Sequence, residues 1–161
     1  FDDDKQTPDS MNVTFDYGDK ALVWEMRIWN PYGMEDQQNG VAVYGTDAVI
    51  HIGRWGGRWG YKLLDKAGKL VEYYNPGAEG NSDPENHQKN FIDCVRSRKL
   101  PNADIGVGHI SAIHCHLANI VARTGRNVRF DPGTETVIDD PEANLYVKRT
   151  YRSHWGTPKL L

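Results

Sequence analysis

The stretch from Asn86 to Arg126, NHQKNFIDCVRSRKLPNADIGVGHISAIHCHLANIVARTGR, decides the fold class. It predicts two helices joined by a loop that contains Pro101, Asn102 and two glycines. Before it, segments with strand patterns follow one another without a helix between them. Strands first and helices second are typical of an α+β fold. We therefore expect an open, mainly antiparallel mixed sheet of about five to seven strands, with the helices packed on one face.

Six short segments before residue 75 alternate in polarity or are rich in residues that favour strands. They are Met11–Tyr17, Lys20–Trp29, Gly40–Tyr44, Ala48–Ile52, Tyr61–Leu64 and Leu70–Tyr74. The segment Gly53–Gly60, with the sequence GRWGGRWG, predicts a turn region. The polar segment Asn75–Asp83 predicts a linker to the first helix.

Helix signals follow the linker. Asp83 as a cap and Pro84 at the first helical position predict a helix that ends near Arg98. The second helix, about Gly108–Thr124, has an apolar side, a small-residue side and a polar side. Because a surface helix needs only one apolar stripe, we expect this helix to be central, with partners on two sides. A last helix begins near Asp140.

The composition bounds the class of protein. A chain of 161 residues with 39% hydrophobic and 25% charged residues suits one globular domain. A net charge of −3 gives no basic surface for nucleic acid. No run approaches the roughly 18 apolar residues of a membrane helix, so we expect neither nucleic acid nor membrane as a partner. The first residues, FDDDK, include no initiator Met, and we interpret the chain as part of a longer polypeptide of unknown compartment.

The sequence His114-Cys115-His116 invites a metal-binding interpretation. Residues two apart on a helix point about 200° from each other, so these histidines cannot bind one ion, and we expect no metal. Cys94 and Cys115 lie in helical patterns among apolar residues. This predicts buried free thiols, with a disulfide between the two helices as the alternative.

A possible polar patch lies on the predicted strand Lys20–Trp29. Glu25 and Arg27 share one face of it with Trp29. An ion pair that is solvated or covered by a subunit would explain them without a function. The alternative is a polar patch with an aromatic wall that binds a sugar. Trp55 and Trp59 could likewise stack on carbohydrate or pack on the sheet.

In their order along the chain, these segments resemble a known family. The run Val13–Trp29, VTFDYGDKALVWEMRIW, and the run Asn90–Arg126, NFIDCVRSRKLPNADIGVGHISAIHCHLANIVARTGR, are similar to the C-terminal half of the Gfo/Idh/MocA family. This is the family of glucose–fructose oxidoreductase, inositol dehydrogenase and a rhizopine-catabolism protein. The similarity covers nearly the whole chain. Its motifs are a VWE-x-R strand, a DCVRSRK segment and a GH-x-S helix in that order.

The resemblance implies an NAD(P)-dependent oxidoreductase that acts on sugars or polyols. A Rossmann domain would hold NAD or NADP, and residues 1–161 would form a single C-terminal domain for substrate binding and homo-oligomer contacts. The family's Gly-rich dinucleotide turn, its Glu-Lys-Pro lysine and its Asp/His pair have no counterpart here. We therefore expect the Rossmann domain, in cis or in trans, outside this chain, and the isolated chain to supply no catalytic or cofactor-binding residue.

For substrate hydroxyls we expect contacts from Glu25, Arg27, Trp29, His87 and His109. Arg27 would act as a forked donor and Glu25 as an acceptor. His87 and His109 begin the two helices, and simple packing there is the rival explanation for both. The alternative function is a stand-alone carbohydrate-binding or assembly module without catalytic activity.

Overall fold

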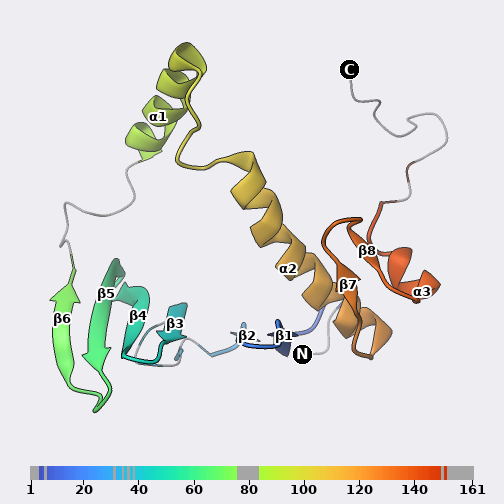
Figure 1. Cartoon of the computed structure of the whole chain (residues 1–161), viewed down its shortest axis with the longest axis horizontal. Helices are drawn as coiled ribbons and strands as arrows, with labels where there is room; N and C mark the ends of the chain where they lie inside the picture. The colour runs from blue at the N-terminus through green and yellow to red at the C-terminus, as the bar shows by residue number, and fades with distance from the viewer. Residues whose placement is uncertain are drawn as a thin grey trace. The chain divides into compact units, whose positions relative to one another are not determined.

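A computed structural model describes residues 4–5, 7–30, 32–33, 35, 37, 39–75, 84–149 and 151. The expected cap Asp83 and most of the expected linker lie outside these residues. The elements are β1 (Ser10–Asp16), β2 (Ala21–Arg27), β3 (Gly40–Tyr44), β4 (Ala48–Trp55), β5 (Arg58–Asp65), β6 (Leu70–Tyr74), α1 (Pro84–Ser97), α2 (Ile105–Thr124), β7 (Phe130–Asp131), β8 (Thr136–Val137) and α3 (Pro141–Asn144) (Figure 1). The chain divides into two compact units, one of Phe1–Met26 with Ala103–Leu161 and one of Arg27–Asn102. Each unit is described by itself.

The predicted α+β class is confirmed. Strands β3, β4, β5 and β6 pair antiparallel in that order, as do β7 and β8, and the first six strands precede the three described helices. The described strands form three sheets of two, four and two strands, where the sequence predicted one sheet of five to seven. The division falls after β2, because residues 28–29 form a turn and do not continue the strand to Trp29 as predicted.

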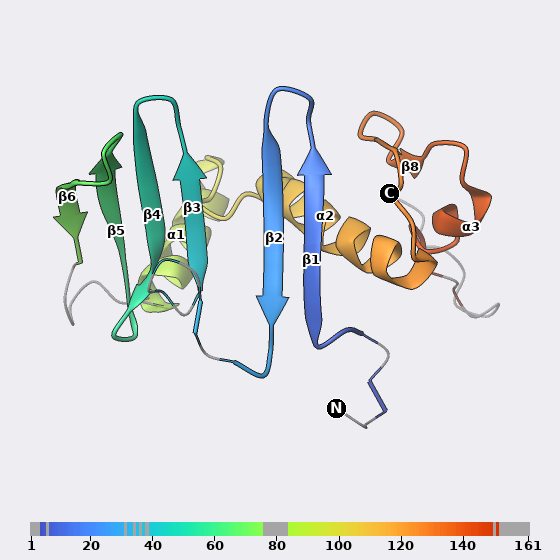
Figure 2. The same cartoon turned by 90° about the horizontal axis from the view of Figure 1, so that it is seen from below.

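In the first unit, the antiparallel hairpin of β1 and β2 packs beside α2 (Figure 2). The N–H of Tyr17 donates to the carbonyl of Lys20 at 3.0 Å and closes the turn. The ring of Phe15 meets the His114 ring of α2 edge-on, with 5.1 Å between their centroids. Val13, on the same side of β1 as Phe15, is buried. The alternation predicted for β1 thus places Val13 and Phe15 on the side of the strand that faces α2.

The C-terminal half of α2 and the elements after it form a small hydrophobic core. Buried Ile120, Val137 and Ala143 make its centre, and Leu117, Val128, Phe130 and Val147 pack around them. The amide of Asn144 accepts from the N–H of Val137 at 2.9 Å and donates to its carbonyl at 2.6 Å. β8 pairs with β7, and the Asn144 side chain adds these two hydrogen bonds to the buried backbone of Val137.

A charged cluster fixes α3 to the end of α2. Arg126 donates through Nε and Nη2 to the two carboxylate oxygens of Asp140, at 3.0 and 2.7 Å, and through Nη2 to Glu142 at 2.8 Å. Asp140 also caps α3 by accepting from the N–H of Ala143 at 2.9 Å. The predicted start of the last helix near Asp140 is therefore confirmed, with Pro141 in its first turn.

The second unit contains a meander in the order β3-β4-β5-β6, in which each strand pairs antiparallel with the next. Gly56 and Gly57 connect β4 to β5 with φ angles of 58° and 80°. Two-residue turns of this kind need positive φ at both positions, which glycine adopts without strain. The prediction of a turn region over Gly53–Gly60 was wrong. β4 extends to Trp55 and β5 starts at Arg58, because these two glycines suffice to reverse the chain.

Gln37 occupies a slot between two opposed glycines. Gly40 of β3 lies opposite Gly53 of β4. A Cβ atom at Gly53 would lie 1.4 Å from Oε1 of Gln37, and one at Gly40 would lie 2.1 Å from the same atom. The missing side chains make room for the side chain of Gln37, which is buried.

The starts of the two long helices differ in how well the sequence predicted them. α1 begins at Pro84 as expected. α2 begins at Ile105, so the predicted start at Gly108 was wrong by three residues. The Asp104 side chain accepts from the N–H groups of Gly106 and Val107, at 3.0 and 3.4 Å, and this cap brings both glycines of the expected loop into the helix.

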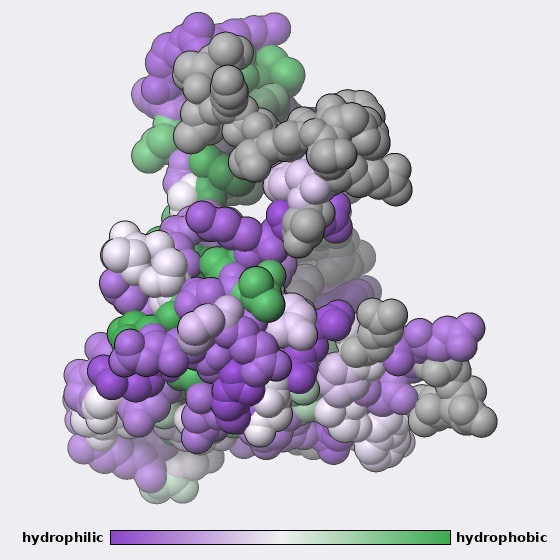
Figure 3. Space-filling view, turned by 90° about the vertical axis from the view of Figure 1, so that its right-hand side faces the viewer, coloured by the Kyte–Doolittle hydropathy of each residue, from purple (hydrophilic) through white to green (hydrophobic). Residues whose placement is uncertain are grey.

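The predicted coverage of α2 on two sides is not found within its unit. Only Ala118 and Ile120 of this helix are buried, whereas Ile105, Val107 and Ile110 are 61–84% exposed. α1 has no buried residue, and Figure 3 shows hydrophobic residues at the molecular surface. Among the described residues, α2 is the one helix long and apolar enough to cross a membrane, a test that core helices also pass. The expectation of no membrane partner stays a prediction.

Candidate functional site

Glu25 and Arg27 lie two residues apart on β2, so their side chains point to the same face of the strand. Glu25 is exposed and Arg27 is half-buried. Trp29 is 54% exposed and lies in the turn after β2. The sequence predicted Trp29 on the same strand face as Glu25 and Arg27. Because β2 ends before Trp29, strand alternation does not place it there.

The remaining predicted residues lie on the two helices. His87 is exposed in the first turn of α1 and belongs, with Arg27 and Trp29, to the unit Arg27–Asn102. His109 is half-exposed on α2 and belongs, with Glu25, to the other unit. The five residues are divided between both units, so their grouping into one substrate site stays a prediction.

His109 has a partner that the sequence did not indicate. Its Nε2 lies 2.6 Å from Oε1 of Glu135, which belongs to the turn between β7 and β8. The two side chains are 54% and 50% exposed. Because Glu135 is 26 residues further along the chain, no helical or strand spacing could have predicted the contact. The only signal was the turn sequence Asp131-Pro132-Gly133, which places a loop after a short strand.

The turn that carries Glu135 is held by Asp131. This carboxylate accepts from the N–H of Gly133 at 2.9 Å and from the hydroxyl of Thr134 at 2.8 Å. The Thr134 hydroxyl bond and the Gly133 N–H lower the pKa of Asp131 from its usual value, because both stabilise the charged carboxylate. The hydroxyl of Thr134 also lies 2.8 Å from that of Thr136. The charged carboxylate of Asp131 thus fixes the conformation of the turn residues that precede Glu135.

His114, by contrast, uses both of its ring nitrogens within its unit. Nδ1 donates to the carbonyl of Ile110 at 2.9 Å, so Nε2 is the acceptor for the Tyr17 hydroxyl at 2.5 Å. This histidine therefore joins the β1–β2 hairpin to α2. Within the described part of the chain, no group of three or more His, Cys, Asp or Glu residues could hold a metal ion.

Neither cysteine takes part in a disulfide. Cys115 is exposed, which corrects the prediction that both thiols are buried, because the side of α2 that carries it is not covered in its unit. Cys94 is half-buried, and its thiol donates to the carbonyl of Leu100 at 3.4 Å.

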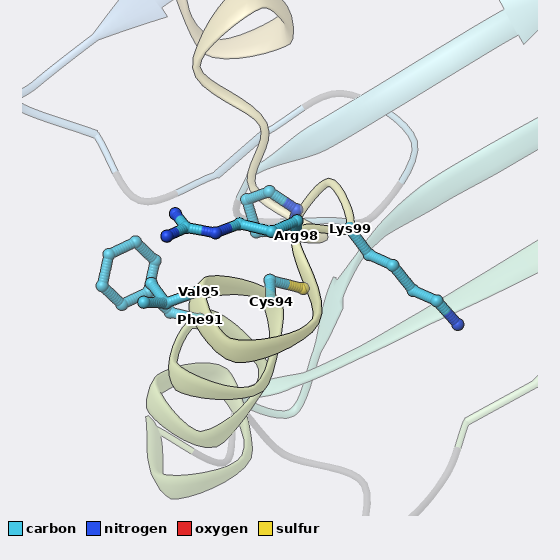
Figure 4. A pocket seen from close by; sticks show the side chains of 6 residues that line it. Phe91, Cys94, Val95, Arg98 and Lys99 are labelled. Carbon is cyan, nitrogen blue, oxygen red and sulfur yellow. The ribbon is translucent and has the colours of Figure 1, made fainter.

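Cys94 also borders a hollow of about 260 Å³ at the end of α1, shown in Figure 4. Its lining is apolar and cationic: Phe91, Cys94, Val95, Arg98, Lys99 and Pro101. The picture shows Phe91 and Val95 on one side of the helix and the Lys99 side chain directed away from them. None of the five predicted site residues lines this hollow, so it does not support the predicted substrate contacts.

A second polar cluster lies on the four-stranded sheet. The Tyr44 hydroxyl donates to Glu35 at 3.0 Å, and the hydrogen bond to this carboxylate raises the pKa of Tyr44. The other oxygen of Glu35 lies 3.8 Å from Nε2 of buried His51.

The indole of Trp55 is covered on one face by the ammonium group of Lys62, 4.8 Å from the ring centroid. Trp55 therefore packs on the sheet and offers no open stacking face on that side.

The sequence of residues 74–157 matches the family model described as the oxidoreductase family, C-terminal alpha/beta domain, of the Gfo/Idh/MocA group. The match covers slightly more than half of the chain. The chain belongs to the Gfo/Idh/MocA oxidoreductase family. Comparisons with curated proteins and with solved structures gave no match. The matched residues of this oxidoreductase-family chain include His87, His109 and Glu135, whereas Glu25, Arg27 and Trp29 precede the match.

Oxidoreductases of this kind imply a nicotinamide cofactor, and neither the four-stranded sheet nor the start of α2 fits one. A dinucleotide pyrophosphate normally binds the free N–H groups of a helix that follows a parallel strand. The four-stranded sheet is antiparallel throughout. At the start of α2, the N–H groups of Gly106 and Val107 already bind the Asp104 carboxylate, whose charge would repel a phosphate.

Proposed function

We propose that this chain is the substrate-binding and oligomerisation domain of an NAD(P)-dependent oxidoreductase that acts on sugars or polyols. The observation that carries the proposal is the match of residues 74–157 to the C-terminal domain of an oxidoreductase family. The matched segment contains α1, α2, β7, β8 and α3, and therefore both predicted histidines.

Polar groups among the five predicted residues support a hydroxylated substrate. Glu25 on β2 and His109 on α2 are both accessible to solvent. Arg27, next on the same strand face as Glu25, offers a forked guanidinium donor. A substrate with several hydroxyl groups can bind such a set of donors and acceptors. In this proposal the five predicted residues orient the substrate and none of them transfers hydride.

The cofactor belongs, in this proposal, to a Rossmann domain in cis or in trans. That domain would bind NAD or NADP and would carry the proton-transfer and hydride-transfer groups. The antiparallel sheet and the occupied start of α2 are consistent with this division of roles.

Oligomer contacts are proposed for one face of the four-stranded sheet. Val41, Ile52, Tyr61 and Tyr74 stand opposite one another in a row across its four strands. Three of them, Val41, Ile52 and Tyr74, are 42–56% exposed. Exposed apolar side chains gathered on one sheet face favour a surface that another protein covers. A second copy of the chain is the occupant that we propose, and light scattering that finds only monomer across micromolar concentrations would contradict it.

The test of the function is a steady-state assay of the chain together with its Rossmann domain, over a panel of sugars and polyols with NAD and NADP. We expect cofactor reduction with at least one polyol or sugar. Arg27→Ala should raise KM more than it lowers kcat, because uniform substrate binding is lost. Arg58→Ala, in the β4–β5 hairpin, is the matched control and should leave both constants unchanged.

The stand-alone carbohydrate-binding module remains the second candidate. Trp29 and Trp59, both about half-exposed, favour it because exposed indoles can stack on sugar rings. This candidate would be favoured over the first if the chain binds sugar but no Rossmann partner gives cofactor reduction with it.

A further inference from the structure

We draw no further inference here: the strongest candidate, the cationic and aromatic surface patch of Arg58 and Trp59 at the tip of the β4–β5 hairpin, carries nothing because nothing among the described residues shows what covers it.

Discussion

The two ends of α2 differ in how the chain covers them. At the C-terminal end, Ile120 is 3% exposed and packs with Val137 and Ala143, and the nearby polar groups of Arg126 and Asn144 are hydrogen-bonded. At the N-terminal end, Ile110 is 61% exposed. The C-terminal end is therefore stabilised by packing within its unit, whereas Ile110 at the N-terminal end is left exposed within that unit.

The largest expected effect comes from the same substitution at both ends. Ile120→Ala should lower the free energy of unfolding by about 3 kcal/mol, because it opens a cavity in the core. Ile110→Ala should change it by less than about 1 kcal/mol, because the side chain is mostly in solvent. Urea unfolding followed by circular dichroism measures both values. Equal losses would show that Ile110 is covered as well and would remove the contrast.

A somewhat smaller loss is expected for Asn144→Ala. The substitution leaves the N–H and the carbonyl of buried Val137 without their partner. An unsatisfied buried group costs about 1–3 kcal/mol, so we expect a loss of about 2 kcal/mol in the same assay. Asn144→Asp is the control: it keeps the acceptor for the Val137 N–H and should retain part of the stability. A neutral effect of Asn144→Ala would show that water replaces these bonds.

The charged cluster should make stability depend on pH at the C-terminal end. Arg126, and then the N–H of Ala143, lower the pKa of Asp140 below its usual value near 3.8. A carboxyl group whose pKa is lower in the folded state stabilises the fold fully above its unfolded pKa, and this contribution is lost as the pH falls through the folded pKa. The urea midpoint should therefore decrease as the pH falls below about 4. In Arg126→Gln the decrease attributable to Asp140 should be smaller, and an unchanged pH profile would contradict the role of this pair.

The smallest effects are expected at two glycines of α2. Gly125 ends the helix with a φ of 67°, so Gly125→Ala should destabilise the protein by about 1 kcal/mol. Gly108 lies inside the helix with open space around its Cβ position, so Gly108→Ala should stabilise it by about 0.5–1 kcal/mol. Thermal unfolding measures the two shifts, and shifts of the same sign would contradict the helix bounds.

The sequence was sufficient for the features that depend on local spacing. The structure contains the elements predicted from alternation in β1, from the β run Gly40–Tyr44, from the proline at the start of α1 and from the Asp140-Pro141 start of α3. The predictions failed at glycines, because glycine occurs in loops and turns and also inside helices and strands. Gly106 and Gly108 suggested a loop, but Asp104 caps the helix before them, and the glycines of GRWGGRWG suggested a long turn although Gly56 and Gly57 alone make it.

Contacts between distant segments could not be predicted from spacing. The sequence predicted His109 as a site residue, but it did not predict its contact with Glu135, because Glu135 comes from another element. The slot that Gly40 and Gly53 leave for Gln37 depends on strand register, which the sequence alone did not specify. For the same reason, the predicted group of Glu25, Arg27, Trp29, His87 and His109 stays a prediction.

The proposed division of roles between this chain and a Rossmann domain is tested most directly by calorimetry of residues 1–161 with NAD, NADH, NADP and NADPH. We expect no binding of any of the four, because the strands of the four-stranded sheet pair antiparallel and the start of α2 is occupied by the Asp104 carboxylate. Binding of any one of them with micromolar affinity would contradict this division of roles, because this chain would then hold the cofactor itself.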